Sequence, residues 1–89
     1  MKDERELDEL LRALAHPARR RIVALTADRS RTAGELAEAT GLSAPATSEH
    51  LKVLRKTGLV ICRIDGRFRI YESGPGAVER VVNALERLR

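Results

Sequence analysis

A first amphipathic helix is predicted over residues 4–15, because apolar residues recur there with helical spacing, at Leu7, Leu10, Leu11 and Leu14. Pro17 ends this helix, since a residue that precedes a proline avoids the helical conformation. The same proline suits the first turn of a second helix, where its missing N–H costs nothing. We expect the second helix to continue to about Ala27.

Two short helices joined by a tight turn are predicted next. Thr32 and Glu35 have the spacing of a capping box, in which each side chain accepts a hydrogen bond from the other residue's backbone N–H. Gly41 can adopt the left-handed conformation that ends the first of these helices, and Ser43 can cap the second. We expect the second of them to continue to about Thr57.

This second helix has two chemically different faces. At about 100° per residue, Thr47, Leu51 and Leu54 share one side, which we expect to be buried. The opposite side is polar and is formed by Pro45, Glu49, Lys52 and Lys56, with Ser48 on its flank. Such a pair of helices is a helix-turn-helix. Its second helix, here residues 44–57, is called the recognition helix because it enters the major groove of DNA in known complexes.

A β-hairpin is predicted after the recognition helix. The Asp-Gly dipeptide at residues 65–66 lies between two β-prone runs and indicates a two-residue type I′ turn. This turn would pair Ile64 with Arg67 and Cys62 with Arg69. A hairpin in this position is a wing, and three arginines are expected to cluster near its tip, namely Arg63, Arg67 and Arg69.

A last helix is predicted over residues 77–89, where one apolar stripe is formed by Val78, Val81, Val82, Leu85 and Leu88. The expected fold is therefore a single domain over residues 1–89, mostly α with a β-hairpin wing, in the order α-α-α-α-β-β-α. The stripes of the two terminal helices could pack within one chain. A core this small leaves little room to cover both, so we favour a homodimer interface that they form together.

The distribution of charge along the chain is more informative than the net charge of +4. Residues 19–69 carry eleven basic and five acidic groups, whereas residues 1–18 carry three and five, and residues 70–89 carry three of each. A basic central segment suits a polyanion such as duplex DNA, although an ordinary solvated surface is an alternative. The two aromatic residues, Phe68 and Tyr71, are too few for the stacking platforms that bind single-stranded nucleic acid.

The chemistry of enzymes is absent from the sequence. It contains no glycine-rich phosphate loop, no Cys–His pair and no cluster of carboxylates, so we predict neither catalysis nor a cofactor. The single cysteine, Cys62, excludes an internal disulfide; we expect it to be buried, with a redox switch as the alternative. The acidic start of the chain and the lack of a membrane-length apolar run predict a cytoplasmic protein with no membrane partner.

Three segments carry a resemblance to a known family: "LRALAHPARRRIVALT", "GELAEATGLSAPATSEHLKVLRKTGLV" and "DGRFRIYE". In order and spacing, residues 7–73 resemble the arsenic-repressor-like ArsR/SmtB family of bacterial winged-helix regulators. The resemblance implies operator DNA as the ligand and a dimer built from the first and last helices. It also implies, for many members, that a bound metal ion lowers the affinity for DNA.

Two features of this chain depart from the metal-sensing members. Those that sense soft metals carry a Cys-x-Cys type sequence in the helix before the turn, where this chain has "GELAEATG". Other members place histidine and carboxylate ligands on the last helix, where this chain has "AVERVVNALERLR". His16 is interpreted as a cap or packing residue, and His50 as a residue that packs or touches a phosphate. We therefore predict no metal site and no response to metal.

The sequence predicts a dimeric, sequence-specific repressor that binds an inverted repeat in double-stranded DNA. The expected DNA contacts come from the recognition helix and the wing, namely Ser43, Ala44, Pro45, Ser48, Glu49, His50, Lys52, Lys56, Arg63, Arg67 and Arg69. Family members often have glutamine and arginine or histidine where this chain has Ala44 and Glu49. That departure keeps open an alternative, a winged-helix module that binds protein and no longer reads DNA, against which the arginine-tipped wing argues.

Overall fold

The elements of the chain follow the predicted order with one addition. The computed structural model describes residues 2–89 and contains the elements α1 (Lys2–Leu14), α2 (Pro17–Asp28), β1 (Arg31–Thr32), α3 (Ala33–Thr40), α4 (Ala44–Lys56), β2 (Val60–Asp65), β3 (Phe68–Ser73) and α5 (Ala77–Glu86). This arrangement confirms a mostly helical, winged helix-turn-helix fold. The helix α1 begins two residues earlier than predicted, and α5 ends three residues earlier.

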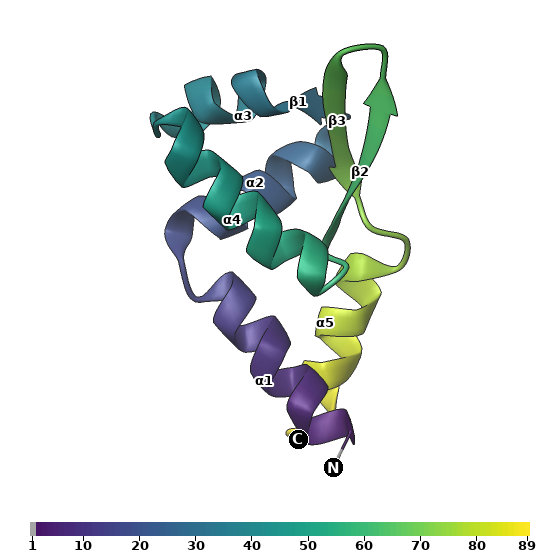
Figure 1. Cartoon of the computed structure of the whole chain (residues 1–89). Coiled ribbons are helices and arrows are strands. Elements are labelled where there is room, and N and C mark those ends of the chain that lie inside the picture. The colour runs from purple at the N-terminus through teal and green to yellow at the C-terminus, as the bar shows by residue number, and fades with distance from the viewer. Residues whose placement is uncertain (1) are drawn as a thin grey trace.

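The elements lie along an elongated molecule of 42 × 22 × 21 Å. The terminal helices α1 and α5 lie side by side at one end, and the hairpin of β2 and β3 projects from the other (Figure 1). The helices α2, α3 and α4 lie between them. The fold thus separates the wing from the terminal helices, so that each can contact a different partner.

The core is formed by aliphatic side chains from every helix and from the base of the wing. The predicted inner face of α4 is confirmed, since Thr47, Leu51 and Leu54 are each no more than 2% exposed. The Thr47 hydroxyl donates a hydrogen bond to the carbonyl oxygen of Ser43 at 2.9 Å, which satisfies the one polar group that this face buries. The recognition helix is therefore held by its apolar face, and its polar face remains exposed.

The helix ends follow the capping signals in the sequence. The Thr32 hydroxyl accepts from the backbone N–H of Glu35 at 3.1 Å, and the Glu35 carboxylate accepts from the N–H of Thr32 at 2.9 Å. This second hydrogen bond holds the pKa of Glu35 below its ordinary value. Gly41 ends α3 with φ +72°, and the Ser43 hydroxyl caps α4 by accepting from the N–H of Ala46 at 3.2 Å. The helix-turn-helix is therefore fixed locally at both of its joints.

The predicted register of the hairpin is wrong, because the turn lies one residue later than predicted and each residue of β2 pairs two residues further along β3. Asp65 pairs with Phe68, so the two turn residues are Gly66 and Arg67, and Ile64 faces Arg69 instead of Arg67. A type I′ turn needs a positive φ at both central residues, and here only Gly66 has one, at +60°. A type II′ turn needs a positive φ only at its first central residue, which is Gly66 here, so Arg67 keeps an unstrained backbone.

The two-residue strand β1 was not predicted. It pairs with β3 through Arg31 and Tyr71 and through Thr32 and Ile70, which makes a three-stranded sheet in the order β1-β3-β2. Two residues are too few to show an alternating pattern, so the sequence carries no signal for this strand. Its effect is to fasten the base of the wing to the start of α3.

The ends of the wing meet at two glycines. The N–H of Gly74 donates to the carbonyl oxygen of Leu59 at 3.1 Å, and a β-carbon on Gly74 would overlap the carbonyl oxygen of Gly58. Gly58 itself has φ +77° and follows the last turn of α4. This close approach of two backbones joins the end of the recognition helix to the start of α5. In residues 2–89 no helix is long and apolar enough to cross a bilayer.

Candidate nucleic-acid interface

The first half of α4 exposes a polar surface next to the wing. Pro45, Ser48 and Glu49 are exposed, and so is Lys52 further along the helix, as the helical periodicity predicted; Ala44 at the start of the helix is exposed as well. Glu49 and Lys52 form an ion pair of 3.6 Å between two largely exposed side chains. Such a pair is weak in water, so either side chain can exchange its partner for a DNA group at little cost.

A cleft of about 430 Å³ separates this helix from the wing. Its walls come from the start of α3, the first half of α4 and the strand β3, and its lining residues are Ala33, Gly34, Ala37, Ala44, Ser48, Leu51, Arg69 and Tyr71. The cleft brings together Ser48 and Arg69, two of the predicted DNA contacts from distant parts of the sequence. A hydroxyl and a guanidinium in one cleft are suited to binding phosphate oxygens.

The three wing arginines do not form the single cluster that was expected. Side chains alternate between the two faces of a hairpin, and the register places Arg69 on the face of the buried Tyr71 and Arg63 on the opposite face. Arg63 donates to the Glu72 carboxylate at 2.7 Å and lies 3.9 Å from that of Asp65. Arg69 therefore faces the recognition helix, whereas the charge of Arg63 is already paired on the outer face.

Arg67 lies in the turn at the tip of the wing. Its guanidinium carbon is 5.5 Å from the centre of the Phe68 ring, a distance at which a cation and an aromatic face attract each other. Phe68 is 53% exposed. This contact restrains a long side chain at the place where the wing would meet a DNA groove.

His50 is placed on the side of α4 that faces α2. Its ring centroid is 4.3 Å from that of His16, and His16 caps α2 by accepting at Nδ1 from the N–H of Ala18 at 3.1 Å. Burial lowers the pKa of His50, and the neighbouring His16 and Arg19 lower it further. The capping role predicted for His16 is therefore confirmed, and His50 is a packed, half-buried residue at the edge of the exposed face of α4.

Lys56 lies at the opposite end of α4 from Ala44. It is the last residue of α4, about 18 Å along the helix axis from Ala44 at 1.5 Å per residue, and it borders a hollow with Glu9 and Arg12 of α1. Helical periodicity gives the direction of a side chain but ignores its position along the axis. Lys56 therefore shares the polar face of Lys52 without sharing its surroundings.

Several residues at or near the cleft were not predicted as contacts. Ala33 and Gly34 line it from α3, and no sequence pattern pointed to them. Arg55 is exposed on α4. Burial raises the pKa of Tyr71, and the nearby guanidinium groups of Arg55 and Arg69 partly oppose this rise. The helical repeat did contain a signal for Arg55, since a residue seven positions after Ser48 returns to the same side of a helix.

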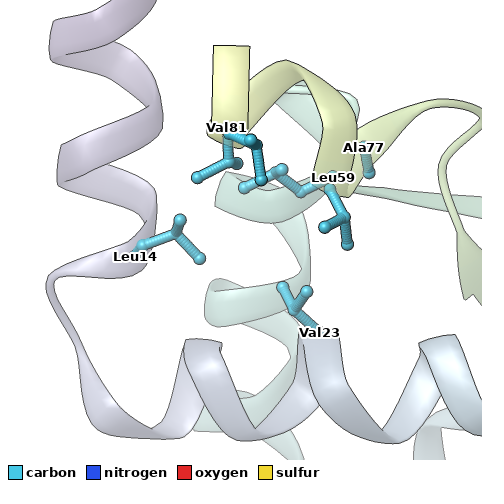
Figure 2. Close-up of a pocket in the computed structure, with 7 residues that line it drawn as sticks. Leu14, Val23, Leu59, Ala77 and Val81 are labelled. Carbon is cyan, nitrogen blue, oxygen red and sulfur yellow. The ribbon is translucent and has the colours of Figure 1, made fainter. Parts of the chain in front are cut away.

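The terminal helices present a second, apolar surface. Leu10, which was expected on the dimer face, is only 1% exposed and belongs to the core of the single chain. Five other residues of the two predicted stripes are exposed, namely Leu11, Val78, Val82, Leu85 and Leu88. Val78 and Val82 also border an apolar cavity of about 150 Å³, whose other walls include Leu14, Val23, Leu59, Ala77 and Val81 (Figure 2).

Groups that could bind a metal are scattered. In the part of the chain that the structure describes, no three His, Cys, Asp or Glu side chains come together in a way that could hold a metal ion. Cys62 is half-buried in β2 and pairs across the sheet with Tyr71. His16 and His50 are in contact with each other.

These features define a class of protein. A helix-turn-helix whose second helix and arginine-bearing wing border one cleft is the DNA-binding part of a winged helix-turn-helix regulator. Residues 16–61 match the family described as "Bacterial regulatory protein, arsR family". The chain belongs to this family of DNA-binding transcriptional regulators.

Individual relatives agree with this assignment. The chain is similar to the HTH-type transcriptional regulator YgaV of Escherichia coli, with 38% identity over 86% of this chain and 79% of the relative. It is 45% identical to the uncharacterized HTH-type transcriptional regulator Rv0081 of Mycobacterium tuberculosis over 71% of this chain, but the match spans only 56% of that relative's length. A solved structure of a homodimeric winged helix-turn-helix DNA-binding domain from Mycobacterium bovis has 30% identity and a TM-score of 0.74, over 93% of this chain and 76% of the other.

Proposed function

We propose that the protein is a transcriptional repressor that binds an inverted-repeat operator as a homodimer and does not respond to metal ions. The observation that carries the proposal is the cleft between α4 and the wing, which Ser48 and Arg69 line together. A protein that occupies a promoter in this way would prevent access by the transcription machinery. Repression would then need no contact beyond DNA binding.

The DNA contacts follow from the shape of the cleft and the chemistry of its edges. The major groove is about 12 Å wide and admits one α-helix, so the exposed first half of α4 would lie in it. Glu49 would reach a base edge, where a carboxylate can accept from the amino group of cytosine, and the Ser48 hydroxyl would contact a phosphate or a base edge. Lys52, Arg67 and Arg69 would contact phosphates and position the protein.

A second copy would bind at the terminal helices. The exposed apolar residues lie on α1 and α5, at the end of the molecule opposite to the wing, and two of them, Val78 and Val82, border the cavity of Figure 2. In a dimer with a two-fold axis at this surface, each copy would bury the same residues against the other. The two recognition helices would then bind the two halves of a symmetric operator. The relative from Mycobacterium bovis, which is a homodimer, supports this assembly.

A mobility-shift assay with the DNA upstream of the protein's own gene tests the proposal. We expect a complex of one dimer per inverted repeat, with half-sites about 34–36 Å apart. If about six to ten phosphates are contacted, the affinity should fall roughly 10³- to 10⁵-fold between about 50 and about 200 mM salt. A complex with no salt dependence, or no binding to any duplex, would contradict the proposal and favour a protein-binding module.

Independence from metal is tested in the same assay. Adding zinc, nickel or arsenite under reducing conditions should leave the affinity unchanged, because a zinc site needs about four ligands in a tetrahedral arrangement. A loss of affinity of about tenfold at micromolar metal, reversed by a chelator, would reveal a site that forms only in the dimer. A promoter–reporter fusion separates repression from activation, since loss of a repressor raises expression.

A further inference from the structure

One side chain connects three helices at the end of α4. Arg80, in the first half of α5, donates from Nη2 to the carbonyl oxygen of Thr57 at 2.7 Å. Its Nε donates to the carboxylate of Glu6 on α1 at 3.3 Å. Thr57 is the residue that ends the recognition helix. A single guanidinium thus contacts both terminal helices and the end of the helix that faces DNA.

The contact with Thr57 uses a group that the helix cannot satisfy by itself. The last four carbonyl groups of an α-helix have no partner within it, and they carry the negative end of the helix dipole. A guanidinium has several donors in a fixed plane, so Arg80 can bind this carbonyl and a carboxylate at the same time, which a lysine at the end of a flexible chain would do less well.

Gly58 leaves the space that the guanidinium occupies. A β-carbon on Gly58 would lie 2.9 Å from Nη1 of Arg80. Gly58 also has φ +77°, the left-handed conformation that ends α4. The glycine therefore allows the left-handed backbone at the end of α4 and also leaves room for the guanidinium of Arg80. Gly41 has almost the same conformation, with φ +72°, but has no atom near its missing β-carbon, so the two glycines form a matched pair.

We propose that Arg80 is a positioning residue, which holds the end of the recognition helix against α1 and α5 so that the arrangement of the terminal helices influences the affinity for DNA. The inference rests on the proposed operator binding. Arg80 touches no DNA in this scheme, because α5 lies at the opposite end of the molecule from the wing (Figure 1). By linkage, DNA binding would change the association of the terminal helices by the same factor.

A structural ion pair alone would behave differently. An isolated pair on a surface adds little to stability, and its loss would leave the recognition helix where it is. The proposal instead requires that α4 loosens at its last turn when Arg80 is replaced. The backbone N–H groups of Thr57, Gly58 and Leu59, which donate to carbonyls of α4, report on that turn directly.

The test compares Arg80→Gln with Arg87→Gln. Both remove one positive charge, Arg80 from the first half of α5 and Arg87 from its end, and Arg87 is exposed and has no ion pair within residues 2–89. We expect Arg80→Gln to bind the operator about 2- to 30-fold more weakly than Arg87→Gln at the same salt, the range typical of couplings through a packed network. Equal affinities of the two variants would overturn the proposal while leaving operator binding by the unmodified protein intact.

A second comparison does not depend on DNA. Amide hydrogen exchange of Thr57, Gly58 and Leu59 should be faster in Arg80→Gln than in Arg87→Gln, and exchange in α3 should be the same in both. Gly58→Ala should reproduce the effect relative to Gly41→Ala, since both alanines strain the backbone and only the first displaces Arg80. Unchanged exchange at the end of α4 in both comparisons would overturn the proposal even if no operator were bound.

Discussion

The imidazole rings of His16 and His50 lie with their centroids 4.3 Å apart and their planes inclined by 47°. His16 caps α2 through its Nδ1 atom, and His50 belongs to the recognition helix. Nδ1 of His16 can accept this hydrogen bond only while it carries no proton, so the second nitrogen of the neutral ring holds the hydrogen. The contact therefore ties the start of α2 to the side of the recognition helix.

Stability should decrease as the solution is acidified through the range in which His50 titrates. Its pKa is lowered in the folded protein by burial and by the nearby His16 and Arg19, with Glu49 acting in the opposite direction. Because the unfolded chain then binds more protons than the native chain, the contribution of His50 to stability is fully present above the ordinary pKa of 6.5 and is lost as the pH falls through the folded pKa.

This prediction is measured by urea unfolding on both sides of that pKa. The loss of unfolding free energy on acidification should be smaller in His50→Gln, which keeps a polar side chain of similar length without a titrating ring. The carboxylates contribute a background that both proteins share. An identical pH dependence in the two proteins would show that His50 does not carry the effect.

Replacing Gly74 by alanine should destabilise the protein severely. The new β-carbon would overlap the carbonyl oxygen of Gly58, and a backbone atom cannot rotate away as a side chain can. We expect a loss of unfolding free energy of about 3 kcal/mol, the upper part of the range for overpacking. Gly66→Ala is the control, since it has φ +60° with open space around it and should cost only about 1–2 kcal/mol. Equal losses would mean that the two backbones separate easily.

The two strand arginines of the wing should differ in their effect on DNA affinity. Arg69→Gln should weaken binding and reduce the slope of log affinity against log salt by about 0.9, the value for one phosphate contact. Arg63→Gln should change both much less, because that guanidinium is paired with Glu72 on the other face of the hairpin. Titrations of both variants with one duplex at several salt concentrations make the comparison. If Arg63→Gln had the larger effect, DNA would contact the outer face of the wing.

Two leucines of the terminal helices should separate association from folding. Leu85 is 45% exposed in the single chain, so Leu85→Lys should weaken the dimer without unfolding the protomer. Leu10 is buried in the core, so Leu10→Ala should reduce the unfolding free energy by about 2–5 kcal/mol. Sedimentation across a range of concentrations and denaturant unfolding measure the two effects. Unchanged sedimentation of Leu85→Lys would place the dimer contact elsewhere.

The local features of the fold were predictable because each depends on a few neighbouring residues. The capping box of Thr32 and Glu35, the left-handed Gly41 and the buried face of α4 follow from hydrogen-bonding and periodicity rules that act within one helix. The hairpin was predictable as an element but not in register. The Asp-Gly dipeptide indicates a type I′ turn at residues 65–66, whereas the turn lies at residues 66–67, where Arg67 does not need a positive φ.

The features that were not predictable depend on contacts between distant segments. Leu10 has the same helical spacing as its neighbours, and only the packing of α1 against the rest of the chain shows that it is covered within the protomer. Arg63 and Arg69 are similar in sequence context, and the pairing of β2 with β3 assigns them to opposite faces. The contact of Arg80 with Thr57 spans 23 residues and is carried by no motif.

The start of α1 and the end of α5 lie at the end of the molecule opposite to the wing (Figure 1). Under the proposed assembly, the ends of two copies would meet near the two-fold axis and away from the duplex. A flexible Gly/Ser linker could then join two copies into one polypeptide without crossing the operator. Such a tandem protein would permit a change in one recognition helix only, at Glu49 for example, and would bind operators whose two halves differ in sequence.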